Sequence, residues 1–321
     1  MIRRSLSFAL LLVSLVSFGK PNQGLEAQKV LSGFLEGSIG LNQAINRIQF
    51  LGYERPVCHE LLMVLKRTGD KRKREQILEF VASIAVRDKD VEESLVGMLS
   101  GDEAGELMLA ARGLARLESA AAVKPLIGLL GHQVFGVRRE ATRALGEIGK
   151  PAATAPLLQA AKTEQDLELK LLMITSAGKA GDRKQVPAFE ALLKDGSEST
   201  RQAAAQALCL LGAAKGVQFA SRLLASADRH ERMQGVMLFE GASAKVASPV
   251  LAPVLADKDD RVRARAARIL VQGGDAARLE WLVLESARAQ GEVRLIYEDE
   301  LERLRLSDEQ RQAILKKAGA Q

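Results

Sequence analysis

The sequence predicts an all-α protein, built as an α-solenoid of helical hairpins, on three observations. Related segments recur along the 321-residue chain every 31 or 32 residues, and a fixed period of this length is typical of a solenoid. Within each segment the apolar positions follow the spacing of one helical face. The composition is 47% hydrophobic but only 4% aromatic, which favours closely packed helices over a β-rich core.

The repeat is clearest in "VRREATRALGEIG", residues 137–149. Aligning on its closing glycine gives related segments at 106–118, 169–181, 200–212, 231–243, 262–274 and 293–305. One column of the alignment holds mostly small residues, and columns four and seven residues later are mostly apolar. This spacing predicts one buried helical face, and the small column lets neighbouring helices approach closely. Each segment is therefore predicted to be the inner helix of a hairpin.

The outer helices are expected between these segments. Prolines stand at or near their starts, where a missing N–H group does little harm: Pro125, Pro151, Pro156, Pro187, Pro249 and Pro253. Asp195 and Asp257 lie in the turns that lead into the inner helices, where they can cap those helices.

Another column of the inner helices contains six cations in succession. This cation column consists of Arg138, Lys170, Arg201, Arg232, Arg263 and Arg294. We expect it to be structural, with each cation bonding to turn carbonyls and to acidic turn residues of adjacent repeats. The alternative is a row of contacts to a ligand.

The N-terminus has the layout of a secretory signal peptide. "MIRRSLSFALLLVSLVSFGK" carries two arginines, then an apolar stretch, then small residues that suit a signal peptidase. The apolar stretch is shorter than the roughly 20 residues of a membrane span. We therefore expect cleavage after Gly19 and an exported protein, periplasmic or secreted. The alternative is an uncleaved inner-membrane anchor, and membrane contact is expected through the N-terminus only.

The net charge and the cysteine content restrict which partners and which kinds of site we expect. The formal net charge of +6 is mild for this length, so nucleic acid is not expected as a partner. The densest basic run, "KRTGDKRKR" at 66–74, is predicted to be a solvated turn, with binding to phosphates or an anionic membrane as the alternative. Cys58 and Cys209 have no spacing that suggests a disulfide or a metal site, and are predicted to be small core residues.

These features divide the chain into five parts. Residues 1–19 are the signal peptide, and 20–40 are an N-terminal lead-in. Residues 41–105 are predicted to form degenerate helical repeats, because their helical segments lack a clear signature. The regular array covers 106–274, and 275–321 form a C-terminal capping repeat and tail.

The segment "VRREATRALGEIG", followed by "KPAATAPLLQAAK", resembles the HEAT repeat, specifically the short bacterial type also found in phycobilin lyase subunits. The resemblance is good over 106–274. It implies a right-handed superhelix whose inner helices line a concave face. Most members of this family are binding scaffolds, so the resemblance is specific for fold and says little about function.

Enzymes of related architecture depend on catalytic or metal-binding residues that this sequence lacks or places differently. Deoxyhypusine hydroxylase resembles this architecture and holds two irons with His-Glu pairs. Here the pairs His59-Glu60 and His230-Glu231 are out of the register that enzyme uses, and the chain has three histidines in all. A pigment lyase role is disfavoured by the signal peptide and the scarcity of aromatic residues. No phosphate-binding loop, nucleophile motif or Cys-x-x-Cys is present. We therefore predict no catalytic, cofactor-binding or metal-binding residue.

A surface for a partner remains. Two columns of the inner helices should face the groove, and both mix arginines with apolar residues. The candidate partner-binding residues are Arg139, Arg143, Leu171, Gln202, Gln206, Met233, Met237 and Arg268. Arginine and methionine are common at protein interfaces, although methionine at helical spacing is also typical of a core.

The sequence thus predicts an exported, monomeric, non-catalytic scaffold that binds a protein through its concave face. One alternative is a membrane-associated assembly or chaperone-like factor for an envelope complex. Another is an enzyme, such as a lyase, whose site the sequence does not reveal.

Overall fold

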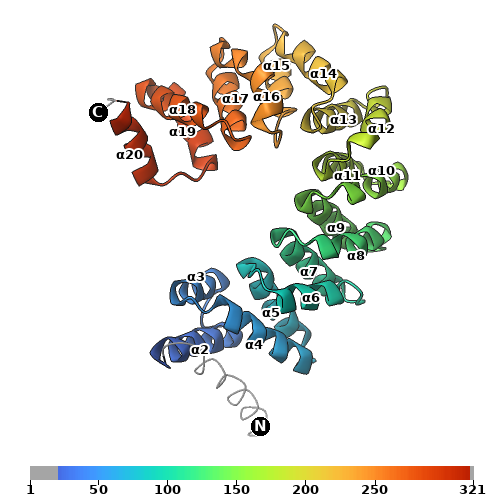
Figure 1. Ribbon diagram of the computed structural model, residues 1–321, viewed down its shortest axis with the longest axis vertical. Coiled ribbons are helices and arrows are strands. Elements are labelled where there is room, and N and C mark those ends of the chain that lie inside the picture. The colour runs from blue at the N-terminus through green and yellow to red at the C-terminus, as the bar shows by residue number, and fades with distance from the viewer. Residues whose placement is uncertain (1–20, 319–321) are drawn as a thin grey trace. The chain divides into compact units, whose positions relative to one another are not determined.

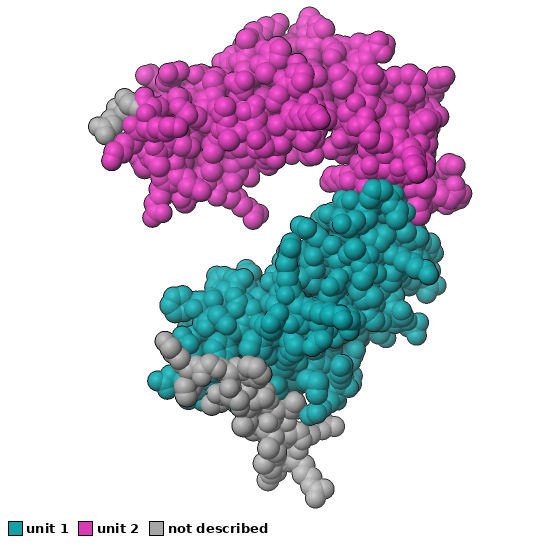
Figure 2. Space-filling model, viewed as in Figure 1, with its two compact units in different colours: residues 1–153 teal, residues 154–321 magenta. Residues whose placement is uncertain are grey.

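The structure, a computed structural model, describes residues 21–318, so the predicted signal peptide at 1–19 lies outside the described residues. Every regular element among them is an α-helix or a short 3-10 helix (Figure 1). The predicted all-α fold class is therefore confirmed. The chain divides into two compact units, residues 1–153 and 154–321 (Figure 2). We call them unit 1 and unit 2, and the boundary falls inside the predicted array of 106–274.

Unit 1 is a succession of helical hairpins. Its elements are α2 (Pro21–Glu36), α3 (Leu41–Leu51), α4 (Glu54–Arg67), α5 (Lys71–Ile84), α6 (Lys89–Met98), α7 (Ala104–Arg116), η2 (Ala120–Ala122), α8 (Val123–Gly128), η3 (Leu129–Gly131), α9 (Phe135–Ile148) and η4 (Pro151–Ala153). Outer helices α4, α6 and α8 pair with inner helices α5, α7 and α9. Within the predicted lead-in, α2 packs Phe34 against Phe80 of α5, with ring centroids 5.1 Å apart.

Unit 2 continues the same pattern. Its elements are α10 (Thr154–Thr163), α11 (Leu167–Ala180), η5 (Arg183–Gln185), α12 (Val186–Leu192), α13 (Glu198–Leu210), α14 (Ala214–Leu224), α15 (Arg229–Met237), α16 (Ala244–Leu251), η6 (Pro253–Ala256), α17 (Asp260–Gln272), α18 (Ala276–Arg288), α19 (Gly291–Arg303) and α20 (Asp308–Lys317). The inner helices are α11, α13, α15, α17 and α19, each paired with the helix before it. Among residues 21–318 no single helix is long and apolar enough to cross a membrane, and α13 with α14 reach those limits only as a pair bent by 117°.

The starts of the inner helices reproduce the period of the sequence. From α7 to α19 they begin at residues 104, 135, 167, 198, 229, 260 and 291, in steps of 31 or 32. Helix α5 begins at residue 71, a step of 33 residues before α7, which extends the series with a slightly longer step into the part predicted to be degenerate. The repeat therefore persists there in the structure, although its sequence signature is lost.

The closing glycine of the repeat has a conformational role. Gly149, Gly181 and Gly212 have φ values of 65°, 87° and 63° where their helices end. Only glycine adopts this left-handed conformation without steric cost, and it ends a helix by turning the chain away. Glu118 and Arg305 occupy the same column and adopt φ values of 55° and 53°. The turn thus survives where the glycine is absent.

Close approach of the inner helices builds the core. The small column is fully buried, as at Ala110, Ala141, Ala204 and Ala266. The helices also approach closely at Gly178 of α11, where a Cβ atom would lie 2.6 Å from the Cα atom of Ala207 on α13. Both cysteines are free and buried in this core, and burial raises the pKa of each thiol to about 12.

We expect Gly178→Ala to destabilise the protein by about 1 to 3 kcal/mol, because the added methyl group must push α11 and α13 apart. Urea denaturation followed by circular dichroism measures the change. Gly97→Ala is the control, since Gly97 lies in α6 with no atom within 4 Å of its missing Cβ. It should leave stability unchanged or raise it by about 0.5 to 1 kcal/mol through helix propensity. Equal effects of both substitutions would refute the close-approach explanation.

Candidate functional site

Each inner helix presents the same positions in the same order, counted from its N-cap residue. The N-cap residues of α13, α15 and α17 are Ser197, Asp228 and Asp259. The cation column is the fourth residue after the N-cap, and the predicted groove columns are the fifth and the ninth. We call the surface formed by these fifth and ninth residues the inner face, and describe it for each unit separately.

The cation column closes the turns that lead into the inner helices. Four arginines donate from Nη1 to carbonyl oxygens five or six residues earlier, at distances of 2.6 to 3.2 Å. The pairs are Arg138 with His132 and Gln133, Arg201 with Asp195 and Gly196, Arg232 with Ser226 and Ala227, and Arg263 with Asp257. Each arginine thereby satisfies carbonyls that the preceding outer helix and its turn leave without partners.

Two members of the cation column do not bond to turn carbonyls. Arg294 lies 3.9 Å from Glu298 with its side chain 60% exposed, and no bond from Lys170 to a turn carbonyl is present among the described residues. A further member, Arg74 on α5, was missed by the sequence analysis. It donates to the carbonyl oxygens of Leu65 and Thr68 at 2.7 and 3.3 Å. Its distance of four residues from the N-cap residue Asp70 was the available signal.

Arg232 also forms a buried ion pair with Asp257, from Nε and Nη2 to both carboxylate oxygens at 2.8 and 3.0 Å. Burial alone raises the pKa of Asp257, but hydrogen bonds from Arg232 and from the backbone N–H of Asp259 outweigh burial. The pKa of this carboxyl group therefore lies below its usual value. The pair ties α15 to the turn before α17.

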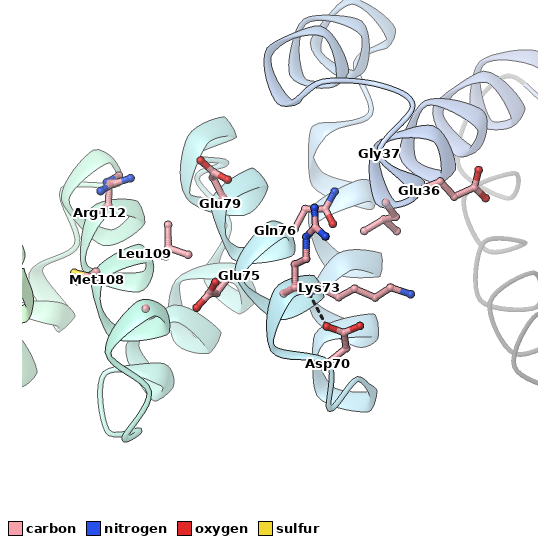
Figure 3. Close-up of a pocket in the computed structure, with 13 residues that line it drawn as sticks. Glu36, Gly37, Asp70, Lys73, Glu75, Gln76, Glu79, Met108, Leu109 and Arg112 are labelled. Atoms are coloured by element: carbon pink, nitrogen blue, oxygen red, sulfur yellow. Dashed lines mark hydrogen bonds between the residues drawn. The ribbon is translucent and has the colours of Figure 1, made fainter.

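The inner face of unit 1 borders a cavity of about 800 Å³ between the end of α2 and helices α5 and α7. Its lining combines acidic, basic and apolar side chains. Those on α5 and α7 include Glu75, Gln76, Glu79, Met108, Leu109 and Arg112 (Figure 3). Gln76 is fixed, because its amide donates to the carbonyl oxygen of Phe34 at 2.6 Å. The other polar groups named here lie open to the cavity.

On α9, the two predicted groove residues of unit 1 have different surroundings. Arg143 pairs with Glu140 and Glu147 of its own helix, and Arg112 of α7 reaches the same Glu140 carboxylate at 3.3 Å. The hydrogen bond to Glu140 raises the pKa of Arg143. Arg139 is exposed, and no ion pair holds it among residues 21–318. Arg139 is therefore the available cation of this face.

In unit 2 the predicted groove residues differ widely in exposure. Leu171, Gln202, Gln206 and Met233 are partly buried, whereas Met237 is 45% exposed. The side-chain Nε2 atom of Gln202 donates a hydrogen bond to Oε1 of Gln234 at 3.4 Å, which links α13 to α15. Leu295 of α19 is 67% exposed and was not among the predicted residues, although it stands in the same column as Leu171 and Met233.

The prediction that Arg268 lines the groove is corrected by the structure. Only 5% of Arg268 is exposed, because carboxylates approach it from both sides. Its two Nη atoms bond to Glu240 at 3.0 and 2.8 Å, and its Nε atom bonds to Glu300 at 2.5 Å. Arg265 pairs with the same Glu300 at 2.6 Å. Arg268 therefore joins α17 to α19 and to the segment after α15.

One group of three potential metal ligands occurs among the described residues, formed by His59, Asp88 and Asp90. Asp88 is already engaged, by Arg55 at 2.7 Å and by His59 at 2.9 Å. It also caps α6 by accepting from the backbone N–H groups of Asp90 and Val91. These contacts form an ion-pair cluster that connects α4 to the start of α6. His230 and Glu231 are both exposed.

Comparison with known proteins identifies the repeats. Residues 95–173 and 154–238 match the family model for HEAT repeats. The chain therefore contains HEAT repeats over residues 95–238, as the resemblance of "VRREATRALGEIG" predicted. No curated protein sequence matches it.

Several solved structures are similar to the chain at low sequence identity. The complex of CpcE and CpcF of phycocyanin lyase from Nostoc sp. PCC7120 is 16% identical, covers 77% of this chain and 94% of that one, and has a TM-score of 0.48. An engineered protein is 20% identical, with coverages of 89% and 86% and a TM-score of 0.44. Human deoxyhypusine hydroxylase in complex with glycerol is 20% identical, with coverages of 79% and 98% and a TM-score of 0.34.

The ion pair of Arg232 and Asp257 predicts a dependence of stability on pH. Since the folded-state pKa of Asp257 is lowered, its contribution is complete above the usual carboxyl pKa of about 3.9 and is lost as the pH falls through the lowered value. Asp257→Asn should reduce the urea midpoint at pH 7, and its difference from the native chain should shrink between about pH 5 and pH 3. Asp195→Asn, which alters a turn carboxylate that accepts from the backbone N–H of Ser197 and has no ion pair within residues 21–318, should have the smaller effect at pH 7. A difference that persists unchanged at pH 3 would contradict the assignment.

The surroundings of Arg268 and Met237 predict opposite consequences for stability. Arg268→Met should lower the free energy of unfolding by about 3 to 5 kcal/mol, because it leaves the facing Glu240 without its partner and the buried Glu300 with Arg265 alone. Met237→Gln should change it by less than about 0.5 kcal/mol, because the side chain is exposed. Urea titration of both variants measures the difference. A stable Arg268→Met protein would return Arg268 to the candidate binding residues.

Proposed function

We propose that this protein is an exported, non-catalytic scaffold that binds a partner protein through its inner faces. The observation that carries the proposal is the position of exposed apolar side chains in unit 2. Among residues 154–318 the exposed large hydrophobic residues are Leu167, Met237 and Leu295. All three lie on inner helices, one each on α11, α15 and α19. Apolar groups held at the surface on one class of helix are typical of an interaction surface.

The architecture supports the same function. Stacked helical repeats create extended surfaces, since each repeat contacts its neighbours and presents one equivalent position to the partner. The cation column stabilises the turns, and apart from Arg268, which joins α17 to α19, this leaves the fifth and ninth positions to vary. Export is proposed from the layout of residues 1–19, and the partner is therefore expected in the same compartment.

Crosslinked capture from the protein's own envelope fraction tests the proposal. The native chain should enrich one specific protein, and Met237→Glu together with Leu295→Glu should reduce that enrichment at least about tenfold, because each places a charge in an apolar contact. Met63→Glu is the matched control. Met63 is 42% exposed, close to Met237, but lies on the outer helix α4.

All variants should keep the native circular dichroism spectrum. Equal enrichment by the native chain and the double variant would refute binding through the inner face of unit 2. Loss with Met63→Glu alone would move the interface to the outer helices.

A further inference from the structure

On α5 the fifth and ninth positions of the inner face of unit 1 are acidic, while Arg72 and Lys73 of the same helix also line the cavity. Glu75 and Glu79 are the fifth and ninth residues after the N-cap residue Asp70 and lie one helical turn apart. Neither carboxylate has a hydrogen bond or an ion pair within residues 21–318. Gly105 of α7 makes room for the first, since a Cβ atom there would lie 2.6 Å from a carboxylate oxygen of Glu75. Two neighbouring carboxylates without partners favour a cation from a binding partner.

In the middle of this face, on α7, the fifth position is the apolar Met108, and the ninth, Arg112, pairs with Glu140. Met108 and Leu109 of α7 are partly buried and line the same cavity as Glu75 and Glu79 (Figure 3). The sulfur atom of Met108 reaches the start of α9, where a Cβ atom on Gly136 would lie 2.9 Å from it. The thioether therefore continues the apolar surface from α7 towards α9. Methionine adapts its shape to different apolar side chains.

The far end of the face is basic. Arg112 and Arg143 share Glu140, which leaves Arg139 as the exposed cation of α9 without a partner among the described residues. Along the row of fifth positions, Glu75 on α5, Met108 on α7 and Arg139 on α9, the face thus changes from acidic to apolar to basic. A complementary ligand must present a cation, an apolar group and a carboxylate in that order.

The spacing of the helices indicates the conformation of such a ligand. Neighbouring packed helices lie about 8 to 10 Å apart. A polyproline II helix has three residues per turn and rises about 3.1 Å per residue, so equivalent side chains repeat every 9 Å or so along one face. Each turn of such a segment therefore advances from one inner helix to the next.

We propose that the inner face of unit 1 binds an extended, polyproline II segment of a partner protein, with a basic, an apolar and an acidic side chain at three-residue spacing. The basic residue pairs with Glu75 and Glu79, the apolar residue contacts Met108 and Leu109, and the acidic residue pairs with Arg139. Either chain direction satisfies this order. The inference rests on the proposed binding function and specifies the chemistry of the partner for this unit.

Fluorescence anisotropy with labelled synthetic peptides and the full chain tests the inference. The probe is KPPLPPE, and the comparison peptides are KPPLPPK, EPPLPPE and the rearranged KPPEPPL. The native chain should bind KPPLPPE or its reverse, EPPLPPK, at least about tenfold more tightly than each comparison peptide, because every comparison places a like charge or an unmatched group on one helix. The preference should weaken at high salt.

Charge reversal in the protein should invert the preference. Arg139→Glu should bind KPPLPPK more tightly than KPPLPPE, and Glu75→Lys together with Glu79→Lys should favour EPPLPPE. Lys124→Glu is the control, because Lys124 is exposed on the outer helix α8 of the same unit, and it should leave the native preference unchanged. Recovery of binding with a complementary peptide also shows that the variants are folded.

Equal binding of all peptides by the native chain, or a preference that the variants do not invert, would overturn the inference. This result is distinguishable from failure of the proposed function. A captured partner that depends on the inner face, together with no peptide preference, would retain the function and reject the polyproline II ligand. Peptide preferences as described, without capture through the inner face of unit 2, would confine binding to unit 1.

Discussion

The close approach of the inner helices is the constraint on which the rest of the structure depends. Small residues at buried positions bring successive inner helices together, as between α5 and α7 at Gly113, where a Cβ atom would lie 3.1 Å from the Cα atom of Ala82. At this separation the backbone of one helix packs on the next with little between them. The fourth, fifth and ninth residues after the N-cap are consequently carried to the same place in every repeat.

The fourth position shows how this constraint assigns roles to charges. An arginine there lies beside the turn that enters its helix, and its guanidinium group reaches carbonyl oxygens five or six residues earlier. A planar group with several donors can satisfy two carbonyls at once, as Arg138 and Arg201 do. Lys170, with a single ammonium group, has no such bond among the described residues. The regular row of cations is thus explained by turn geometry.

The fifth and ninth positions are free of this requirement and differ between the units. In unit 1 the fifth position passes from Glu75 on α5 to Met108 on α7 and to Arg139 on α9, and the ninth from Glu79 to Arg112 and Arg143. In unit 2 most of these positions hold glutamines or apolar residues, with Met237 and Leu295 at the surface, whereas the ninth position of α17 is the buried Arg268. Variation at positions that the core does not restrain is what a binding scaffold requires, since the partner is then selected by side chains that contribute little to stability.

The sequence alone determined the fold class, the period and the identity of the inner helices, because those features depend on local spacing: apolar residues at helical intervals, and a glycine where several of the inner helices end. It also located the cation column and the presence of Arg139, Met237 and Leu171 on the inner helices. Only the tertiary structure decided which of these side chains are available. Arg268 and Arg139 are both arginines of inner helices, yet Glu240 and Glu300, distant in sequence, bury the first and nothing engages the second among the described residues. Availability depends on which carboxylates the neighbouring helices bring close, and that is a property of three-dimensional packing that no single repeat encodes.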